Sequence, residues 1–227
     1  KLRENLELIQ RVQTEAGVSI ILALKGFAMW SVFPMVKRYL SGATASSLNE
    51  ARLIFEEMGC RAHTYAVAYM PDEFEEIMGY SSHITFNSIA QFHRYASAVQ
   101  QYPEKISPGI RVNPEYSEVE VALYNPCAPG SRLGEVSDAF HAGLPEGVEG
   151  LHFHTLCESS SYDLEKVLAA FEARFGHFLP QLKWVNFGGG HLMTRKGYDT
   201  DHLIGLLRAF RARHPHLEVI LEPGSAI

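Results

Sequence analysis

A lysine is the first residue of this sequence whose position suggests chemistry. Lys25 ends an apolar run over residues 18–24 and is followed by Gly26. A lysine amine in a partly desolvated pocket loses its proton more readily and can form a Schiff base with a carbonyl compound. The same position also suits a lysine that extends from a strand end into solvent. From this residue alone, both interpretations stay open.

A run of three glycines is the second candidate. Gly188, Gly189 and Gly190 follow the apolar run 182–187 and precede an expected helix. Glycines let backbone N–H groups approach an anion closely, and a helix N-terminus adds favourable potential. A tight turn would use the same residues. Gly224 and Ser225 follow the last apolar run and could add donors. These segments predict an anion site, most simply a phosphate site.

A carboxylate and two histidines also stand at the ends of apolar runs. Glu222 follows residues 219–221, where a buried acid needs a partner or a proton. It could hold a proton on a ring nitrogen or form a surface salt bridge. His152 and His154 share one face of a strand. With Cys157 they suggest a metal site, whereas a histidine stacked on a planar group needs no metal.

Arg111 lies near the end of another apolar run, residues 106–112. It could hydrogen-bond an anionic oxygen or a histidine, or pair with a nearby carboxylate. The following segment, 113–132, is rich in proline and glycine. It is long enough for a lid, although a surface excursion has the same length.

The elements that must position these residues alternate between short apolar runs and helix-length patterns. We count eight expected strands, each except the last followed by a helix, which indicates parallel β-α-β units. The predicted fold class is therefore α/β, a (β/α)8 barrel over residues 1–227. An open doubly wound sheet is the alternative. A barrel gathers its active site at the C-terminal ends of the strands.

Composition narrows the classes of function. The 227 residues are 46% hydrophobic and 20% charged, which is typical of a packed globular domain. The net charge of −6 offers no basic field for nucleic acid, and no apolar run is long enough for a membrane span. The three cysteines lack CxxC spacing, so we expect no zinc knuckle, no disulfide framework and a cytoplasmic location.

Together these residues predict a cofactor. A Schiff-base lysine, a phosphate-binding glycine loop, an acid facing a pyridine nitrogen and a ring-stacking imidazole are what pyridoxal 5'-phosphate requires. The sequence predicts these roles for Lys25, Gly188–Gly190, Glu222 and His154, with no metal.

The sequence also resembles the fold-type III pyridoxal-phosphate decarboxylases, a family that includes ornithine, diaminopimelate and arginine decarboxylases. The resemblance covers nearly the whole chain. It implies that Lys25 attaches the cofactor, His154 stacks on its ring, Glu222 partners the ring nitrogen and Arg111 lies nearby. It also implies that Gly188, Gly189, Gly190 and Gly224 surround the phosphate. The matching stretches are 23–27 (ALKGF), 42–47 (GATASS), 153–158 (FHTLCE), 186–198 (NFGGGHLMTRKGY) and 221–225 (LEPGS).

Three departures indicate a branch of this family. Thr44 stands where ornithine decarboxylases carry an acid, Cys157 replaces a serine, and Ser225 replaces an arginine. These changes favour the branch that decarboxylates carboxynorspermidine and carboxyspermidine in polyamine biosynthesis. The resemblance implies a homodimer with shared active sites. The chain starts inside the first helix and stops after the last strand, so we expect a barrel shortened at both ends, without the family's C-terminal β-domain.

Several alternatives remain at this stage. The chain could be another decarboxylase of the family, acting on diaminopimelate, ornithine or arginine, or a racemase on the same fold. A metal-dependent barrel hydrolase would use His152, His154 and Cys157. A homologue that binds the cofactor without catalysis is the last alternative.

Overall fold

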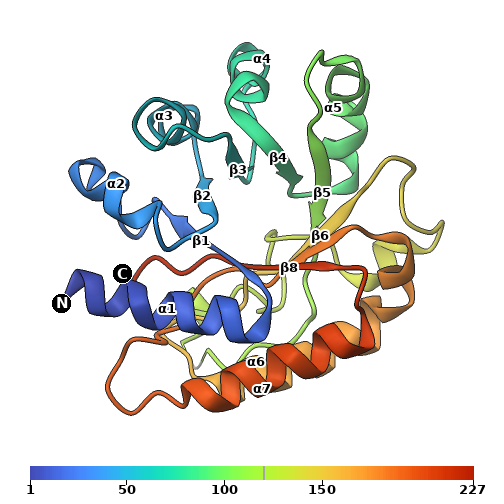
Figure 1. Cartoon of the computed structure of the whole chain (residues 1–227). Helices are drawn as coiled ribbons and strands as arrows, with labels where there is room; N and C mark the ends of the chain where they lie inside the picture. The colour runs from blue at the N-terminus through green and yellow to red at the C-terminus, as the bar shows by residue number, and fades with distance from the viewer. Residues whose placement is uncertain (120) are drawn as a thin grey trace.

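The fold is a closed parallel barrel, seen in a computed structural model that describes residues 1–119 and 121–227 (Figure 1). Within these residues each strand pairs with the next in chain order, and β8 pairs with β1. This confirms the predicted (β/α)8 barrel over the open sheet. The strands are β1 (Ser19–Ala23), β2 (Gly42–Ala45), β3 (Ala62–Tyr65), β4 (Ser81–Phe86), β5 (Ser107–Arg111), β6 (Gly150–His152), β7 (Trp184–Asn186) and β8 (Glu218–Leu221).

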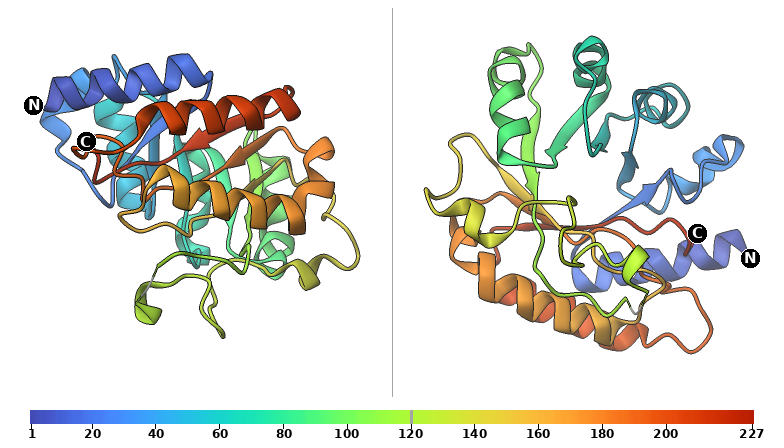
Figure 2. Two further views of the ribbon diagram at one scale, coloured as in Figure 1. Left: turned by 90° about the horizontal axis from the view of Figure 1, so that it is seen from below. Right: turned by 180° about the vertical axis from the view of Figure 1, so that it is seen from behind.

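Helices surround the barrel on its outer side (Figures 1 and 2). The α-helices are α1 (Leu2–Ala16), α2 (Phe33–Val36), α3 (Leu48–Leu53), α4 (Pro71–Tyr80), α5 (Ile89–Gln101), α6 (Ser161–Phe175) and α7 (Thr200–Arg213). The shorter turns are η1 (Trp30–Val32), the π-helical η2 (Ile54–Met58), η3 (Ala122–Tyr124), η4 (Ser137–Phe140) and η5 (Gly176–Gln181). Among the described residues, no helix combines the length and apolar character needed to cross a membrane.

Local sequence signals explain where several helices begin and end. Gly17 ends α1 with φ 68°, a left-handed conformation that glycine adopts readily. The hydroxyl of Ser88 accepts the N–H of Gln91 at the start of α5. Ser160 and Asp163 form a reciprocal capping box at the start of α6. These caps satisfy backbone N–H groups that have no partner inside the helix.

Two connections differ from the prediction. The helix expected after the first strand is only η1 followed by the single turn α2. Between β5 and β6, the described residues form no α-helix, only η3 and η4, so the prediction of a helix after each of the first seven strands was wrong there. Its prolines and glycines do not sustain helical hydrogen bonds. Figure 2 shows this segment reaching past the ends of the strands.

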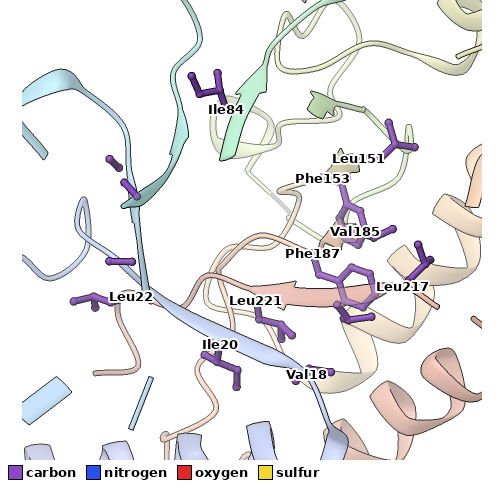
Figure 3. Close-up of a cluster of buried hydrophobic side chains, with 14 of the residues drawn as sticks. Val18, Ile20, Leu22, Ile84, Leu151, Phe153, Val185, Phe187, Leu217 and Leu221 are labelled. Carbon is purple, nitrogen blue, oxygen red and sulfur yellow. The ribbon is translucent and has the colours of Figure 1, made fainter. Parts of the chain in front are cut away.

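The main core lies between the strands and the surrounding helices. Alternate strand residues face outward and pack against the helices, among them Ile20, Leu22, Phe153, Phe187 and Leu221 (Figure 3). These side chains are at most 2% exposed. Their burial explains why the strands read as nearly continuous apolar runs.

The barrel interior contains a separate, smaller cluster. Ile21, Trp184 and Ile220 pack together at its centre. The Trp184 indole lies against Gly109 and Gly150 and donates its N–H to Ser107 Oγ at 2.8 Å. Glycine is required at these two positions because the indole occupies the space that a side chain would fill. This apolar plug closes the barrel beneath the polar strand ends.

Replacing Gly150 with alanine tests this packing. An added Cβ would lie 2.0 Å from indole carbons of Trp184, so we expect Gly150→Ala to lower the free energy of unfolding by about 1–3 kcal/mol. Urea denaturation provides the measurement. Gly205→Ala in α7, where a Cβ meets nothing within 4 Å, is the control and should stabilise by up to about 1 kcal/mol. An unchanged urea midpoint for Gly150→Ala would contradict the packing argument.

Candidate active site

The predicted residues converge at the C-terminal ends of the strands. A cavity of about 270 Å³ is lined by residues that follow β1, β6, β7 and β8. The predicted cofactor-binding residues among them are Lys25, His154, Gly189, Gly190, Glu222 and Gly224. Gly188 lies against Phe153 and His154 instead of lining the cavity, and Arg111 lines a neighbouring cavity. The barrel therefore gathers residues that are up to about 200 positions apart in the chain, as expected for this architecture.

Glu222 is a buried carboxyl group, 6% exposed, just beyond the end of β8. Burial raises its pKa, while the Asn186 amide, Lys25 and Thr44 act in the opposite direction. Asn186 Nδ2 donates to Glu222 Oε1 at 2.7 Å. His152 Nε2 is 3.8 Å from Oε2, which is too long for a hydrogen bond. The alternative of a surface salt bridge is therefore wrong, and this carboxyl group faces the cavity.

His154 is held in one tautomer by the glycine segment. The N–H of Gly189 donates to His154 Nδ1 at 2.9 Å, so this nitrogen carries no proton. Burial, with the positive charges of Lys25 and Arg111, holds the pKa of His154 well below its usual value. The ring is therefore neutral at pH 7, with its proton on Nε2.

The glycine segment works differently from the prediction. Besides Gly189, the N–H of Gly188 is occupied, because it donates to Asn186 Oδ1 at 2.8 Å. The expected helix N-terminus is absent from this point, since α7 begins only at Thr200. A Cβ at any of the three glycines would overlap with neighbouring backbone. It would lie 2.6 Å from the backbone oxygen of Phe153 at Gly188, 2.3 Å from that of Glu222 at Gly189 and 2.2 Å from that of Leu156 at Gly190.

Arg111 is a buried cation, 4% exposed, at the end of β5. Its guanidinium donates to the Tyr65 hydroxyl at 2.7 Å and to the backbone oxygen of His154 at 3.0 Å. It also lies over the Tyr65 ring, 5.0 Å from the centroid. Arg111 thus contacts a histidine, as one interpretation predicted, but through the main chain. No carboxylate pairs with it among the described residues.

Lys25 is at the mouth of the barrel and is exposed, which agrees with the interpretation of a lysine that extends from a strand end. It lines both the 270 Å³ cavity and an adjoining cavity of about 440 Å³. The second cavity is also lined by Tyr65, Arg111 and His154, and by Tyr124, Pro126 and Leu133 from the long connection. This placement gives the lysine amine access to whatever enters either cavity.

The metal interpretation receives no support from the geometry. Among the described residues, no group of three or more histidine, cysteine or acidic side chains is arranged to hold a metal ion. His152 lies inside the barrel with its edge toward Tyr65, His154 accepts the Gly189 N–H, and Cys157 is exposed.

Sequence reasoning missed three residues of this site. Asn186 connects Glu222 to the glycine segment, Tyr65 receives Arg111, and His191 is a buried imidazole beside Gly190. Asn186 and Tyr65 end β7 and β3, so a search of every strand end for polar side chains would have found them.

The barrel is similar to the barrels of solved decarboxylase structures. A crystal structure of diaminopimelate decarboxylase from Helicobacter pylori superimposes with a TM-score of 0.75 at 16% identity, covering 97% of this chain and 62% of the other. At that identity the similarity shows the fold alone. No family model matches the sequence.

More similar proteins confirm the predicted resemblance to the polyamine branch. The chain is 49% identical to carboxyaminopropylagmatine decarboxylase from a Synechocystis strain and 46% identical to carboxynorspermidine/carboxyspermidine decarboxylase from Campylobacter jejuni. Each comparison covers 100% of this chain and 58% of the relative. The crystal structure of Campylobacter jejuni carboxynorspermidine decarboxylase with norspermidine gives a TM-score of 0.89 at 44% identity, over 100% of this chain and 57% of that one. The chain thus spans less than two thirds of these relatives.

The burial of Glu222 predicts a pH dependence of stability. Its raised pKa means that the folded protein binds a proton more tightly than the unfolded chain. The stabilising contribution is present below the unfolded pKa, about 4.3, and is lost as pH rises through the folded pKa. For the cofactor-free protein, we expect wild type to lose stability relative to Glu222→Gln as the pH rises above about 4.3, by about 1.4 kcal/mol per unit of pKa difference.

Denaturation at a series of pH values measures this difference. Glu75→Gln removes an exposed carboxylate from α4 and serves as the control. A constant difference between wild type and Glu222→Gln across the range would show that this carboxyl group has no raised pKa.

Proposed function

We propose that this protein is a pyridoxal-phosphate-dependent decarboxylase whose substrate is a carboxylated polyamine, carboxynorspermidine or carboxyspermidine. The observation that carries the proposal is one cavity that combines Lys25, the imidazole of His154 and the buried carboxyl group of Glu222. Identity of 46% to a carboxynorspermidine/carboxyspermidine decarboxylase supports the substrate. The 49% identity to a carboxyaminopropylagmatine decarboxylase makes that compound a second candidate.

The residues present fit the cofactor. Glu222 is a buried acid with one oxygen occupied by Asn186, and a protonated pyridine nitrogen would supply the missing cation. His154 offers a neutral imidazole whose orientation is fixed at Nδ1. At Gly188–Gly190, and between Gly26 and Gly224, the backbone packs too closely for any Cβ, and this brings backbone groups of several strand ends to the cavity. When bound, the cofactor supplies an electron-accepting ring for the pair of electrons released with carbon dioxide.

Each residue then has a defined task. The Lys25 amine would hold the cofactor covalently. Glu222 would hold a proton at the ring nitrogen, which requires the carboxyl group to be ionised. Asn186 and Thr44 favour that ionised state. His154 would support the ring, and Arg111 fixes the backbone of His154.

The adjoining 440 Å³ cavity is the proposed substrate entrance. Two basic side chains, Lys25 and Arg111, line it, and no carboxylate does among the described residues. Charge therefore directs the substrate carboxylate inward and the distal ammonium groups outward. Acidic groups for those amines must come from elsewhere, which fits a site shared between subunits and a C-terminal β-domain.

Exposed apolar side chains support the proposed homodimer. Met29, Trp30, Val67, Met70 and Leu123 are each more than half exposed and follow β1, β3 and β5. A second copy that covers this end of the barrel would bury them. Three unpaired cysteines fit the proposed cytoplasmic location.

Covalent capture tests the role of Lys25. After incubation with pyridoxal phosphate and reduction with borohydride, peptide mass mapping should find the cofactor on Lys25. Lys25→Ala should lose this label completely, because no other amine lines the cavity among the described residues. Lys37→Ala is the control on the outer surface. A full label in Lys25→Ala would refute the assignment.

Carbon dioxide release tests the reaction and the substrate class. We expect kcat/KM for carboxynorspermidine, carboxyspermidine or carboxyaminopropylagmatine to exceed that for ornithine, arginine and diaminopimelate by about 100-fold or more. A preference for one of the amino acids would overturn the substrate. Cofactor binding without carbon dioxide release from any of them would indicate a non-catalytic homologue or a racemase.

A further inference from the structure

A second buried imidazole in the cofactor cavity has no assigned task. His191 follows the three glycines, is 1% exposed and lines the same 270 Å³ cavity as Lys25 and Glu222. Within the part of the chain that the structure describes, neither of its ring nitrogens has a hydrogen-bond partner. Native proteins rarely leave a buried polar group without a partner, so this imidazole requires an explanation.

The imidazole is neutral and carries one N–H. Burial lowers the pKa of His191 to about 4, so at pH 7 the ring has one donor nitrogen and one acceptor nitrogen. A buried donor without a partner destabilises the protein, and a ligand that accepts this hydrogen bond removes the penalty.

The neighbouring donors indicate which ligand fits. The N–H groups of Gly188 and Gly189 are occupied by Asn186 and His154. By contrast, those of Gly190, Gly224 and Ser225 have no partner among residues 1–119 and 121–227. Gly190, His191 and Ser225 therefore bring donors to one cavity, and converging donors of this kind bind an anion.

Charge places this anion away from the carboxyl group of Glu222. Lys25 is the one lysine or arginine among the described residues that line the cavity, and its proposed task is covalent attachment. Ser225 supplies the one side-chain hydroxyl among those residues. Another side-chain donor is needed, and His191 lies beside Gly190 and close enough to His154 to influence its pKa.

We propose that His191 donates its ring N–H to the phosphate group of the cofactor, together with the backbone N–H groups of Gly190 and Ser225. This inference rests on the proposed cofactor. It assigns phosphate recognition to a side chain of this cavity, in addition to the glycine backbone that the sequence predicted.

Comparison of pyridoxal phosphate with pyridoxal tests the inference, because the two differ only in the phosphate. Binding to the full-length enzyme is measured by tryptophan fluorescence and by the visible absorbance of the bound cofactor. His191→Phe keeps a ring of similar size but removes the donor. We expect its dissociation constant for pyridoxal phosphate to rise about 10- to 100-fold, with that for pyridoxal unchanged.

Two further variants keep the test decisive. His191→Gln retains an N–H donor and should keep the dissociation constant for pyridoxal phosphate within about tenfold of wild type, even where the phenylalanine variant folds poorly. His93→Phe changes an exposed histidine of α5 and should bind both compounds as wild type does. The ³¹P resonance of the bound cofactor should shift in His191→Phe and not in His93→Phe.

The outcomes separate the inference from the proposed function. Equal affinities of wild type and His191→Phe for pyridoxal phosphate would overturn the inference alone, as would an equal loss of affinity for both compounds. Failure of wild type to bind pyridoxal phosphate at all would overturn the proposed function, and the role of His191 with it.

Discussion

The carboxyl group of Glu222 is the constraint on which the mouth of the barrel depends. A buried acid is costly unless hydrogen bonds or a cation stabilise it. Asn186 provides one bond, and the same Asn186 side chain accepts the N–H of Gly188. Glu222 and the glycine segment are therefore linked through a single amide, and the next N–H along, that of Gly189, orients His154. One connected network of hydrogen bonds thus positions the acid, the glycine turn and the imidazole.

Close backbone packing makes this network possible. Gly188–Gly190 lie against the carbonyl oxygens of Phe153, Glu222 and Leu156, and Gly224 lies against Gly26. These contacts bring the ends of β1, β6, β7 and β8 together around one small cavity. The apolar plug of Ile21, Trp184 and Ile220 lies buried inside the barrel. The polar strand ends thus have packed side chains on one side and a cavity on the other.

The sequence predicted the strands and the strand-end residues well, because a closed parallel barrel makes both follow from periodicity alone. Lys25, His154 and Glu222 were found in this way and meet in one cavity. Hydrogen bonds between residues distant in the chain were not predictable. The Gly189 N–H was expected to bind an anion, but it donates to His154, 35 positions earlier, and no local pattern encodes that contact. The missing helix after β5 shows the same limit, since an apolar pattern does not reveal whether a segment packs as a helix.

Under the proposed function, the smaller of the two adjoining cavities would carry the chemistry and the larger one the choice of substrate. The smaller one is built from strand ends and glycine turns, whose positions the barrel hydrogen bonds fix. The larger one is closed by Tyr124, Pro126 and Leu133, which belong to a connection without α-helix in its described part. Loops tolerate substitution far better than strand ends do. Changes in this connection can therefore alter which amine reaches Lys25 while the network around Glu222 stays in place.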